Sequence, residues 1–62
     1  MFKKYLIKNN ISFVENTSID NKEMFFIKYK YMNKILKYLK RYKINHTETY
    51  ACHYEWLVIT LN

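Results

Sequence analysis

The sequence predicts an α+β fold: two tandem αββ repeats that form a four-stranded, mainly antiparallel sheet with two helices on one face. Two observations predict this fold. Helix-like and strand-like patterns follow one another in the order helix, strand, strand, and that order occurs twice. A shift of 33 residues, which carries Lys4 onto Lys37, also aligns the two halves without a gap. We therefore expect one small domain over residues 1–62, with one repeat over about 1–31 and the other over about 32–62.

The first half predicts a short helix followed by two strands. Over residues 2–9, Phe2 and Leu6 share one helix face. Asn9 and Asn10 are suited to end this helix, because asparagine accepts the left-handed backbone conformation found at helix ends. The remaining elements are a strand, a polar loop and a strand, over residues 11–15, 16–22 and 23–31.

The second half predicts an amphipathic helix followed by two more strands. This helix opens at Met32 or Asn33, with Asn33 as the N-cap. Apolar residues fall on one face and basic residues on the opposite face: Met32, Ile35, Leu36 and Leu39 against Lys34, Lys37 and Arg41. A strand, a turn and a strand follow over residues 44–52, 53–55 and 56–61. The last strand is the most apolar, which predicts a central or well-covered position.

The alignment of the two halves indicates an internal duplication. It gives five identical pairs, since Lys4, Tyr5, Leu6, Ile11 and Glu15 match Lys37, Tyr38, Leu39, Ile44 and Glu48. It also carries Phe2 onto Ile35, Lys8 onto Arg41, and Met24, Phe25 and Phe26 onto Leu57, Val58 and Ile59. Because the composition is biased, these identities exceed chance only modestly. The repeated order of elements is the stronger indication.

Two helices on one face leave the other face of the sheet open. Residues at both alternating sets of positions in the last strand are largely apolar, so that strand has no purely solvated side. The two repeats give conflicting indications of which set faces the helices. The open face is expected to bind a second subunit or a protein partner. The expected protein-interface residues are Phe25, Ile27, Tyr29, Trp56 and Val58.

The formal net charge of +6 favours a polyanionic partner, above all nucleic acid. An AT-rich genome, which favours Lys codons, would also raise the charge, and a basic helix stripe is often a solvated face. Tyrosines nevertheless interleave with the lysines, as in proteins that bind single strands. The expected nucleic-acid-binding residues are Lys28, Lys30, Lys34, Lys37, Tyr38, Lys40 and Arg41. One Arg among eleven basic residues favours contacts to phosphates over bidentate reading of bases.

The sequence holds no motif for catalysis, a metal or a cofactor. His46, Glu48, Cys52 and His53 cluster in the chain, but they lack the paired spacing of structural zinc ligands. The acidic residues form no paired-carboxylate motif, and a chain without glycine has no Gly-rich phosphate loop. We therefore expect a non-enzymatic protein with no cofactor and no bound metal.

Cellular location and assembly follow from length and cysteine content. A single cysteine, Cys52, excludes an internal disulfide and fits a reducing cytoplasm. No apolar run approaches the roughly 20 residues of a membrane span, and the start lacks the apolar core of a signal peptide. A chain this short buries only about 60% of the surface that it exposes when unfolded. Self-association is the expected source of additional stability, so a homo-oligomer, such as a homodimer, is predicted.

Two functions follow from these observations. The first is a small, basic nucleic-acid-binding accessory protein that contacts the phosphate backbone with limited sequence specificity. The alternative is a protein-binding adaptor or inhibitor that docks through the open apolar sheet face or an edge strand. Small chains of this composition are often carried by phages or mobile elements, a setting that suits the alternative.

Overall fold

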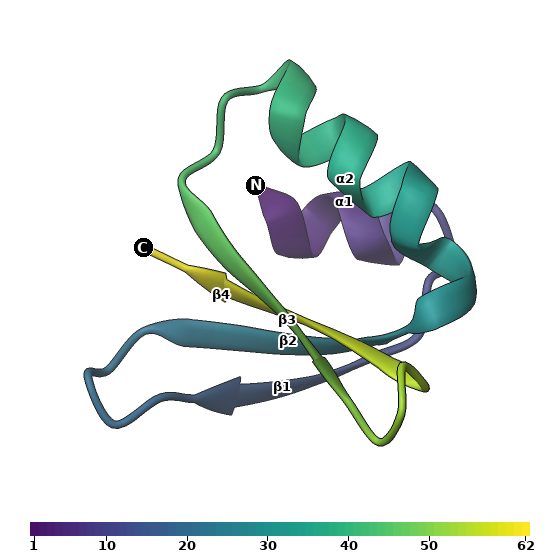
Figure 1. Cartoon of the computed structure of the whole chain (residues 1–62). Helices are drawn as coiled ribbons and strands as arrows, with labels where there is room; N and C mark the ends of the chain where they lie inside the picture. Colours follow the sequence, from purple (N-terminus) through teal and green to yellow (C-terminus); the bar gives the residue numbers. More distant parts are fainter.

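The computed structural model describes all residues from Met1 to Asn62 and has an α+β fold, with two helices packed on one side of a four-stranded antiparallel sheet (Figure 1). In chain order the elements are α1 (Phe2–Lys8), β1 (Phe13–Thr17), β2 (Glu23–Lys28), the 3₁₀ helix η1 (Tyr29–Tyr31), α2 (Met32–Arg41), β3 (His46–Ala51) and β4 (Trp56–Leu61). The predicted α+β class, with two helices and a four-stranded antiparallel sheet, is confirmed.

The strands are ordered β1-β2-β4-β3, and every neighbouring pair is antiparallel. β2 and β4 are therefore central, while β1 and β3 form the two edges. This order accounts for the apolar character of the last strand, because β4 has a strand on each side. Leu57, Val58 and Ile59 are its three consecutive buried residues. The predicted central position of residues 56–61 is confirmed.

The core lies between the helices and one face of the sheet. Phe25 and Ile27 of β2 pair with Ile59 and Leu57 of β4, so these four side chains share a face. All four are fully buried. The helices and the α1–β1 connection complete this nine-residue core with Phe2, Leu6, Ile11, Ile35 and Leu39. Leu57, Ile59 and Leu61 therefore belong to the helix-facing set of β4, which the sequence alone left undecided.

The ungapped alignment of the two halves is wrong in the second strand of each half. A shift of 33 carries Phe25 onto Val58, yet Phe25 faces the helices and Val58 faces away from them. The cause is a difference of one residue in register. Phe13 pairs with Ile27 in the first hairpin, whereas His46 pairs with Leu61 in the second, one residue beyond the position that the shift predicts. A one-residue slip moves every side chain of a strand to the other face.

Both helices end in the same backbone arrangement. At the end of α1, the amides of Asn10 and Ile11 donate to the carbonyl oxygens of Ile7 and Leu6, and Asn10 has a φ of 56°. This is a Schellman motif with a left-handed asparagine, as the sequence predicts. At the end of α2, the amides of Lys43 and Ile44 donate to the carbonyl oxygens of Lys40 and Leu39, and Lys43 has a φ of 52°.

These helix ends shift the strand boundaries. The strands predicted to start at Ile11 and Ile44 do not start there, because the backbone amide of each residue closes the preceding helix. β1 and β3 begin two residues later. The strand predicted over 23–31 stops at Lys28, because η1 turns the chain directly into α2. For the same reason the N-cap of α2 is Tyr31, which makes no side-chain capping bond, and the prediction of Asn33 in that role is wrong.

Candidate nucleic-acid interface

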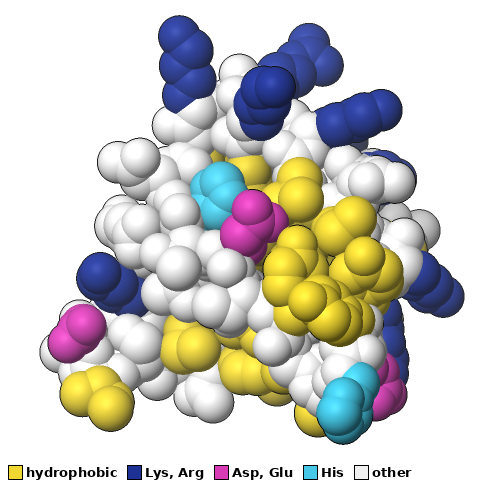
Figure 2. All heavy atoms as spheres, viewed as in Figure 1, with side chains coloured by type: hydrophobic (Ala, Val, Ile, Leu, Met, Phe, Trp, Pro, Cys, Tyr) yellow, Lys and Arg dark blue, Asp and Glu magenta, His cyan; other side chains and the backbone are white.

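The two helices hold most of the positive charge. α1 and α2 contain seven of the eleven basic residues and none of the five acidic ones, so the helix layer has a formal charge of +7 and the rest of the chain −1. Figure 2 shows Lys and Arg side chains projecting from the side of the molecule where α2 lies. An AT-rich genome would raise the lysine content of the chain as a whole. It does not by itself explain why the basic residues gather on the two helices. The helix side therefore has a positive potential that attracts anions.

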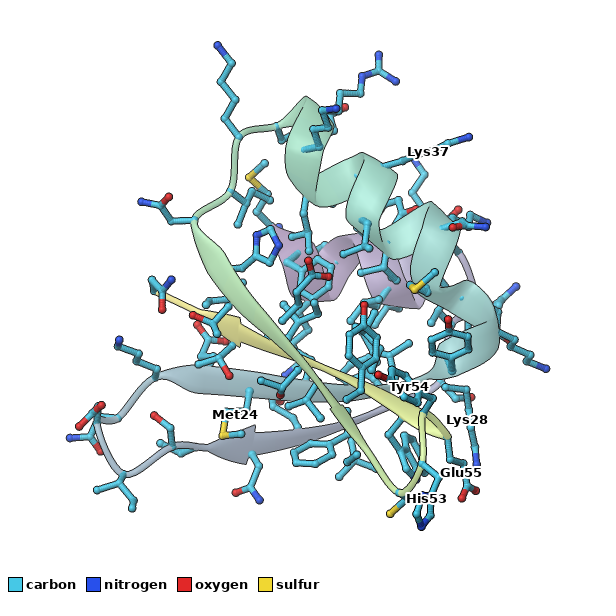
Figure 3. The ribbon with its side chains drawn as sticks, viewed as in Figure 1. Met24, Lys28, Lys37, His53, Tyr54 and Glu55 are labelled. Carbon is cyan, nitrogen blue, oxygen red and sulfur yellow. The ribbon has the colours of Figure 1, made fainter.

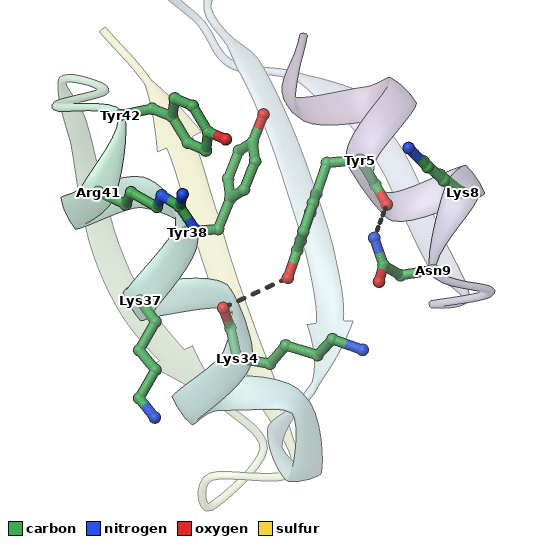
Figure 4. A pocket seen from close by; sticks show the side chains of 8 residues that line it. All are labelled: Tyr5, Lys8, Asn9, Lys34, Lys37, Tyr38, Arg41 and Tyr42. Carbon is green, nitrogen blue, oxygen red and sulfur yellow. Dashed lines mark hydrogen bonds between the residues drawn. The ribbon is translucent and has the colours of Figure 1, made fainter.

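A groove between α1 and α2, here called the helix groove, concentrates this charge. It contains a hollow of about 430 Å³ that both helices line (Figure 4). The lining residues are Tyr5, Lys8, Asn9, Lys34, Lys37, Tyr38, Arg41 and Tyr42. An adjoining hollow of about 360 Å³ shares Tyr5, Lys8, Tyr38 and Tyr42 and adds Met1 and Lys4. The helix groove thus combines five basic side chains with three tyrosines, and no acidic residue lines it.

The three tyrosines of the groove form a continuous series of ring contacts across the two helices. Tyr5 of α1 and Tyr38 of α2 are stacked, with ring centroids 3.8 Å apart and ring planes 22° apart. Tyr42, directly after α2, lies 4.8 Å from Tyr38. Phe2 of the core contacts Tyr38 at 6.0 Å and connects the rings to the core. Packed aromatic pairs of this kind are worth about 0.5–1.5 kcal/mol beyond the area that they bury.

Hydrogen bonds fix the position of Tyr5 in the groove. The side-chain amide of Asn9 donates to the Tyr5 carbonyl oxygen at 2.8 Å, and the Tyr5 hydroxyl makes a long, 3.5 Å bond to the Lys34 carbonyl oxygen (Figure 4). Burial and, to a lesser extent, the neighbouring Tyr38 raise the pKa of the Tyr5 hydroxyl above that of a free tyrosine. Tyr5 therefore keeps its proton at neutral pH and adds no negative charge to the groove.

The basic side chains of the groove have no carboxylate partner. The protein forms two ion pairs, Lys3–Glu15 at 2.9 Å and Lys28–Glu55 at 3.2 Å, and neither includes a lining residue. Arg41 lies 5.6 Å from the centre of the Tyr42 ring, within the range of a cation–π contact. Cations that no carboxylate neutralises remain free to bind the phosphates of an anionic ligand.

The structure divides the predicted nucleic-acid-binding residues into two groups. Lys34, Lys37, Tyr38 and Arg41 line the groove, whereas Lys40 is on α2 but does not line it. Lys28 lies over the Trp56 ring and pairs with Glu55 at the β3–β4 turn, far from Lys37 (Figure 3). Lys30 lies over the ring of Tyr31. The structure brings Lys28 and Lys30 to neither hollow of the groove.

The sequence prediction missed the contribution of α1. Tyr5, Lys8 and Lys4 line the groove opposite α2, and Tyr42 extends the series of rings. A signal for them was present, because the shift of 33 residues carries Lys4, Tyr5 and Lys8 onto Lys37, Tyr38 and Arg41. Residues that the shift matches therefore lie around one groove, because α1 and α2 pack side by side.

The residues predicted for a protein interface lie in three places. Phe25 and Ile27 are fully buried under the helices, so no partner can reach them on the folded protein. Trp56 and Val58 lie on the face of the sheet away from the helices. Tyr29 lies in η1, where its ring contacts those of Tyr50 and Tyr54 at 5.9 and 6.0 Å.

The face of the sheet away from the helices is uncovered, and we call it the open sheet face. Its members are Val14, Asn16, Met24, Phe26, Lys28, Thr47, Thr49, Ala51, Trp56, Val58 and Thr60. Val14, Phe26, Val58 and Thr49 form one row across all four strands. Val14 exposes 57% of its surface, and Phe26, Met24 and Trp56 are partly exposed. This face has an apolar centre with Asn and Thr around it.

The β3–β4 turn contains three successive residues with left-handed backbone: Cys52, His53 and Tyr54, with φ of 54°, 55° and 66°. A left-handed conformation costs a residue other than glycine about 1–2 kcal/mol. Contacts around the turn offset this cost: the Glu55 carbonyl oxygen accepts from the Tyr29 amide, and Tyr54 packs 5.0 Å from Tyr50. Desolvation first, then Glu48 and the neighbouring tyrosines, raise the pKa of Tyr50.

The His and Cys residues do not assemble into a site. The Nδ1–H of His46 donates to the Ile44 carbonyl oxygen at 2.8 Å, and Cys52 is exposed on the turn. No three His, Cys, Asp or Glu side chains come together in a way that would hold a metal ion. Neither helix has the length and apolar character needed to cross a membrane.

Comparison with known protein families, with curated proteins and with solved structures gives no match to this chain.

Proposed function

We propose that this protein is a small, non-enzymatic binding module that holds nucleic acid in the helix groove. One observation carries the proposal: five basic side chains without carboxylate partners surround a series of packed tyrosine rings. Lysine and arginine provide salt-dependent attraction to phosphates, and the rings provide apolar surfaces for bases or sugars. The cations and the aromatic rings occur together in one groove, whereas a basic helix face that is only solvated needs no aromatic surface.

Contacts in this complex are mainly to the phosphate backbone, and sequence specificity is limited. The groove holds a single arginine, Arg41, and bidentate reading of guanine is chiefly a task of arginine. The lysines act as point charges, which bind phosphates without selecting a base. We place the protein in the cytoplasm, which the exposed, unpaired thiol of Cys52 suits.

A binding titration with two triple variants tests this proposal. Labelled oligonucleotides are titrated with the wild type, with Lys34/Lys37/Arg41→Ala, and with Lys22/Lys30/Lys40→Ala. Both variants lose three charges, but only the first loses groove residues. We expect the groove variant to lose most of the affinity and the control to keep most of it. Equal losses would show that net charge acts without the groove, and no binding by the wild type at low salt would refute the proposal.

A second proposal concerns the open sheet face, which we expect to bind a second copy of the chain. Its one ionisable side chain, Lys28, is paired with Glu55 at 3.2 Å, so two such faces meet no uncompensated charge. Two copies joined there would also direct their +7 helix layers away from each other. The result is a homodimer with a helix groove on each outer side. A different protein partner, as for an adaptor or inhibitor, is the alternative occupant.

We also propose that the two αββ units are copies of one ancestral unit. The two Schellman motifs support this idea, because Asn10 and Lys43 occupy equivalent positions 33 residues apart. The buried pairs Phe2/Ile35 and Leu6/Leu39 have the same separation. A chain in which residues 35–44 replace residues 2–11 tests this, since a true copy keeps the helix, its end and its buried face. Failure of that chain to fold would contradict the proposal.

A further inference from the structure

We infer that the helix groove takes single-stranded rather than double-stranded nucleic acid, with an unpaired base stacked on Tyr42. This inference rests on the proposed function and specifies its ligand. It follows from three features of the groove: the arrangement of the rings, the width of the paired helices, and the position of the cations on both sides.

The rings provide one accessible stacking surface, Tyr42, directly after the end of α2. Tyr38 lies between Tyr5 and Tyr42 in the groove, so another tyrosine ring already lies on each side of it (Figure 4). Tyr42 ends the series, contacts no ring beyond Tyr38 and exposes 50% of its surface. A base that stacks on Tyr42 continues the series. The bases of a duplex already stack on one another and are not free to do this.

The shape of the helix pair disfavours a duplex. The major groove of B-DNA is about 12 Å wide and admits one helix, whose diameter with side chains is about 10–12 Å. Here α1 and α2 lie side by side and share the ring contacts of Tyr5 and Tyr38, so the pair is about twice as wide as one helix. The binding surface is the hollow between the helices, which suits a flexible strand that enters it.

The cations lie on both walls of the groove. Lys34, Lys37 and Arg41 come from α2, and Lys4 and Lys8 come from α1. A single strand with a base on Tyr42 passes between these walls, and its phosphates reach lysines on either side. This combination of a basic groove and aromatic stacking is the general means by which proteins bind single strands without sequence preference.

The test compares single and double strands of the same length and sequence by fluorescence anisotropy at one salt concentration. We expect the single strand to bind at least about 5-fold more tightly, the smallest gain from one stacked base. Tyr42→Leu should weaken single-strand binding by about 5- to 150-fold, the range for loss of one stacked base. Tyr42→Phe should keep the affinity, because stacking needs the ring and not the hydroxyl. Tyr54→Leu is the matched control, an exposed tyrosine outside the groove.

The set of outcomes distinguishes a failure of the inference from a failure of the proposed function. Binding of the duplex as tightly as the single strand, with sensitivity to Lys34/Lys37/Arg41→Ala, would overturn the inference and keep the proposed function. Unchanged binding of the single strand by Tyr42→Leu would also overturn the stacking assignment. The absence of binding to either strand form at low salt would overturn both. Circular dichroism of each variant checks that the protein is folded. We expect it to be, because the substituted tyrosines are exposed.

Discussion

The helix side and the open sheet face of this protein differ in charge and in exposed apolar surface. The helix side carries a formal charge of +7 and arranges lysines around packed tyrosines. The open sheet face carries one ionisable residue, Lys28, and places apolar side chains at its centre. Charge and apolar surface are thus separated onto opposite sides of the sheet. Net charge alone therefore does not indicate where an anionic ligand would bind, whereas the segregation of charge onto the helices gives a candidate site.

Adjacent residues of β2 provide the strongest test of this two-sided arrangement. Phe25 is fully buried under the helices, whereas Phe26 is partly exposed on the open sheet face. We expect Phe25→Ala to lower the free energy of unfolding by about 3–5 kcal/mol, the usual cost of a buried Phe. Phe26→Ala should cost clearly less. Urea unfolding of both variants measures the difference, and equal losses would contradict the assignment of the two faces.

The open sheet face is tested by a charge at its most exposed apolar residue. Val14 exposes 57% of its surface, so Val14→Glu leaves the core intact. We expect the wild type to form a dimer as its concentration rises and Val14→Glu to remain a monomer, because a carboxylate without a partner in an interface is costly. Sedimentation equilibrium measures this. Thr17→Glu, on the helix-facing side of the same strand, is the control, and a wild type that is monomeric at all concentrations would exclude the dimer.

The two helix ends predict a smaller effect on stability. Asn10 and Lys43 hold equivalent left-handed positions, but lysine tolerates that conformation less well than asparagine. Lys43→Asn should therefore raise the free energy of unfolding by up to about 1 kcal/mol, and Lys43→Gly should act in the same direction. Thermal unfolding detects this gain. A loss of stability in both variants would show that the Lys43 side chain makes a contribution that outweighs its backbone cost.

The smallest expected effect concerns pH. Because the pKa of Tyr5 is raised in the folded protein, the unfolded chain loses this proton first as pH rises. Stability is fully present below the ordinary tyrosine pKa of about 10 and falls as pH rises from there through the folded pKa. Tyr5→Phe should remove this part of the alkaline loss. Unfolding measured from about pH 8 to about pH 11 tests it, and an identical pH profile for both proteins would contradict the assignment.

Much of the fold is readable from the sequence because its signals are local. The helical spacing of Phe2 and Leu6 and the apolar run 56–61 each predict an element that forms. The strand boundaries and the inward-facing set were not predictable. They depend on the Schellman motifs that occupy the Ile11 and Ile44 amides and on a one-residue difference in hairpin register.

The candidate site was only half predictable for a related reason. We grouped Lys28 and Lys30 with the residues of α2 because they are close in sequence, although Lys28 ends β2 and Lys30 lies in η1. The groove instead joins α2 to α1, which lies about 30 residues away in the chain, and tertiary packing decides that pairing. The aligned pair Tyr5 and Tyr38 held this information, but it becomes a site only when the helices lie side by side.

We propose that the helix groove, and not net charge, binds phosphates. The most direct test is the slope of log K against log salt concentration for a single-stranded oligonucleotide, compared between the wild type and the two triple variants. This slope is negative, and each lost phosphate contact reduces its magnitude by about 0.7, so Lys34/Lys37/Arg41→Ala should make it less steep by about 2. Lys22/Lys30/Lys40→Ala should leave it nearly unchanged. Equal slopes for the two variants would contradict the claim.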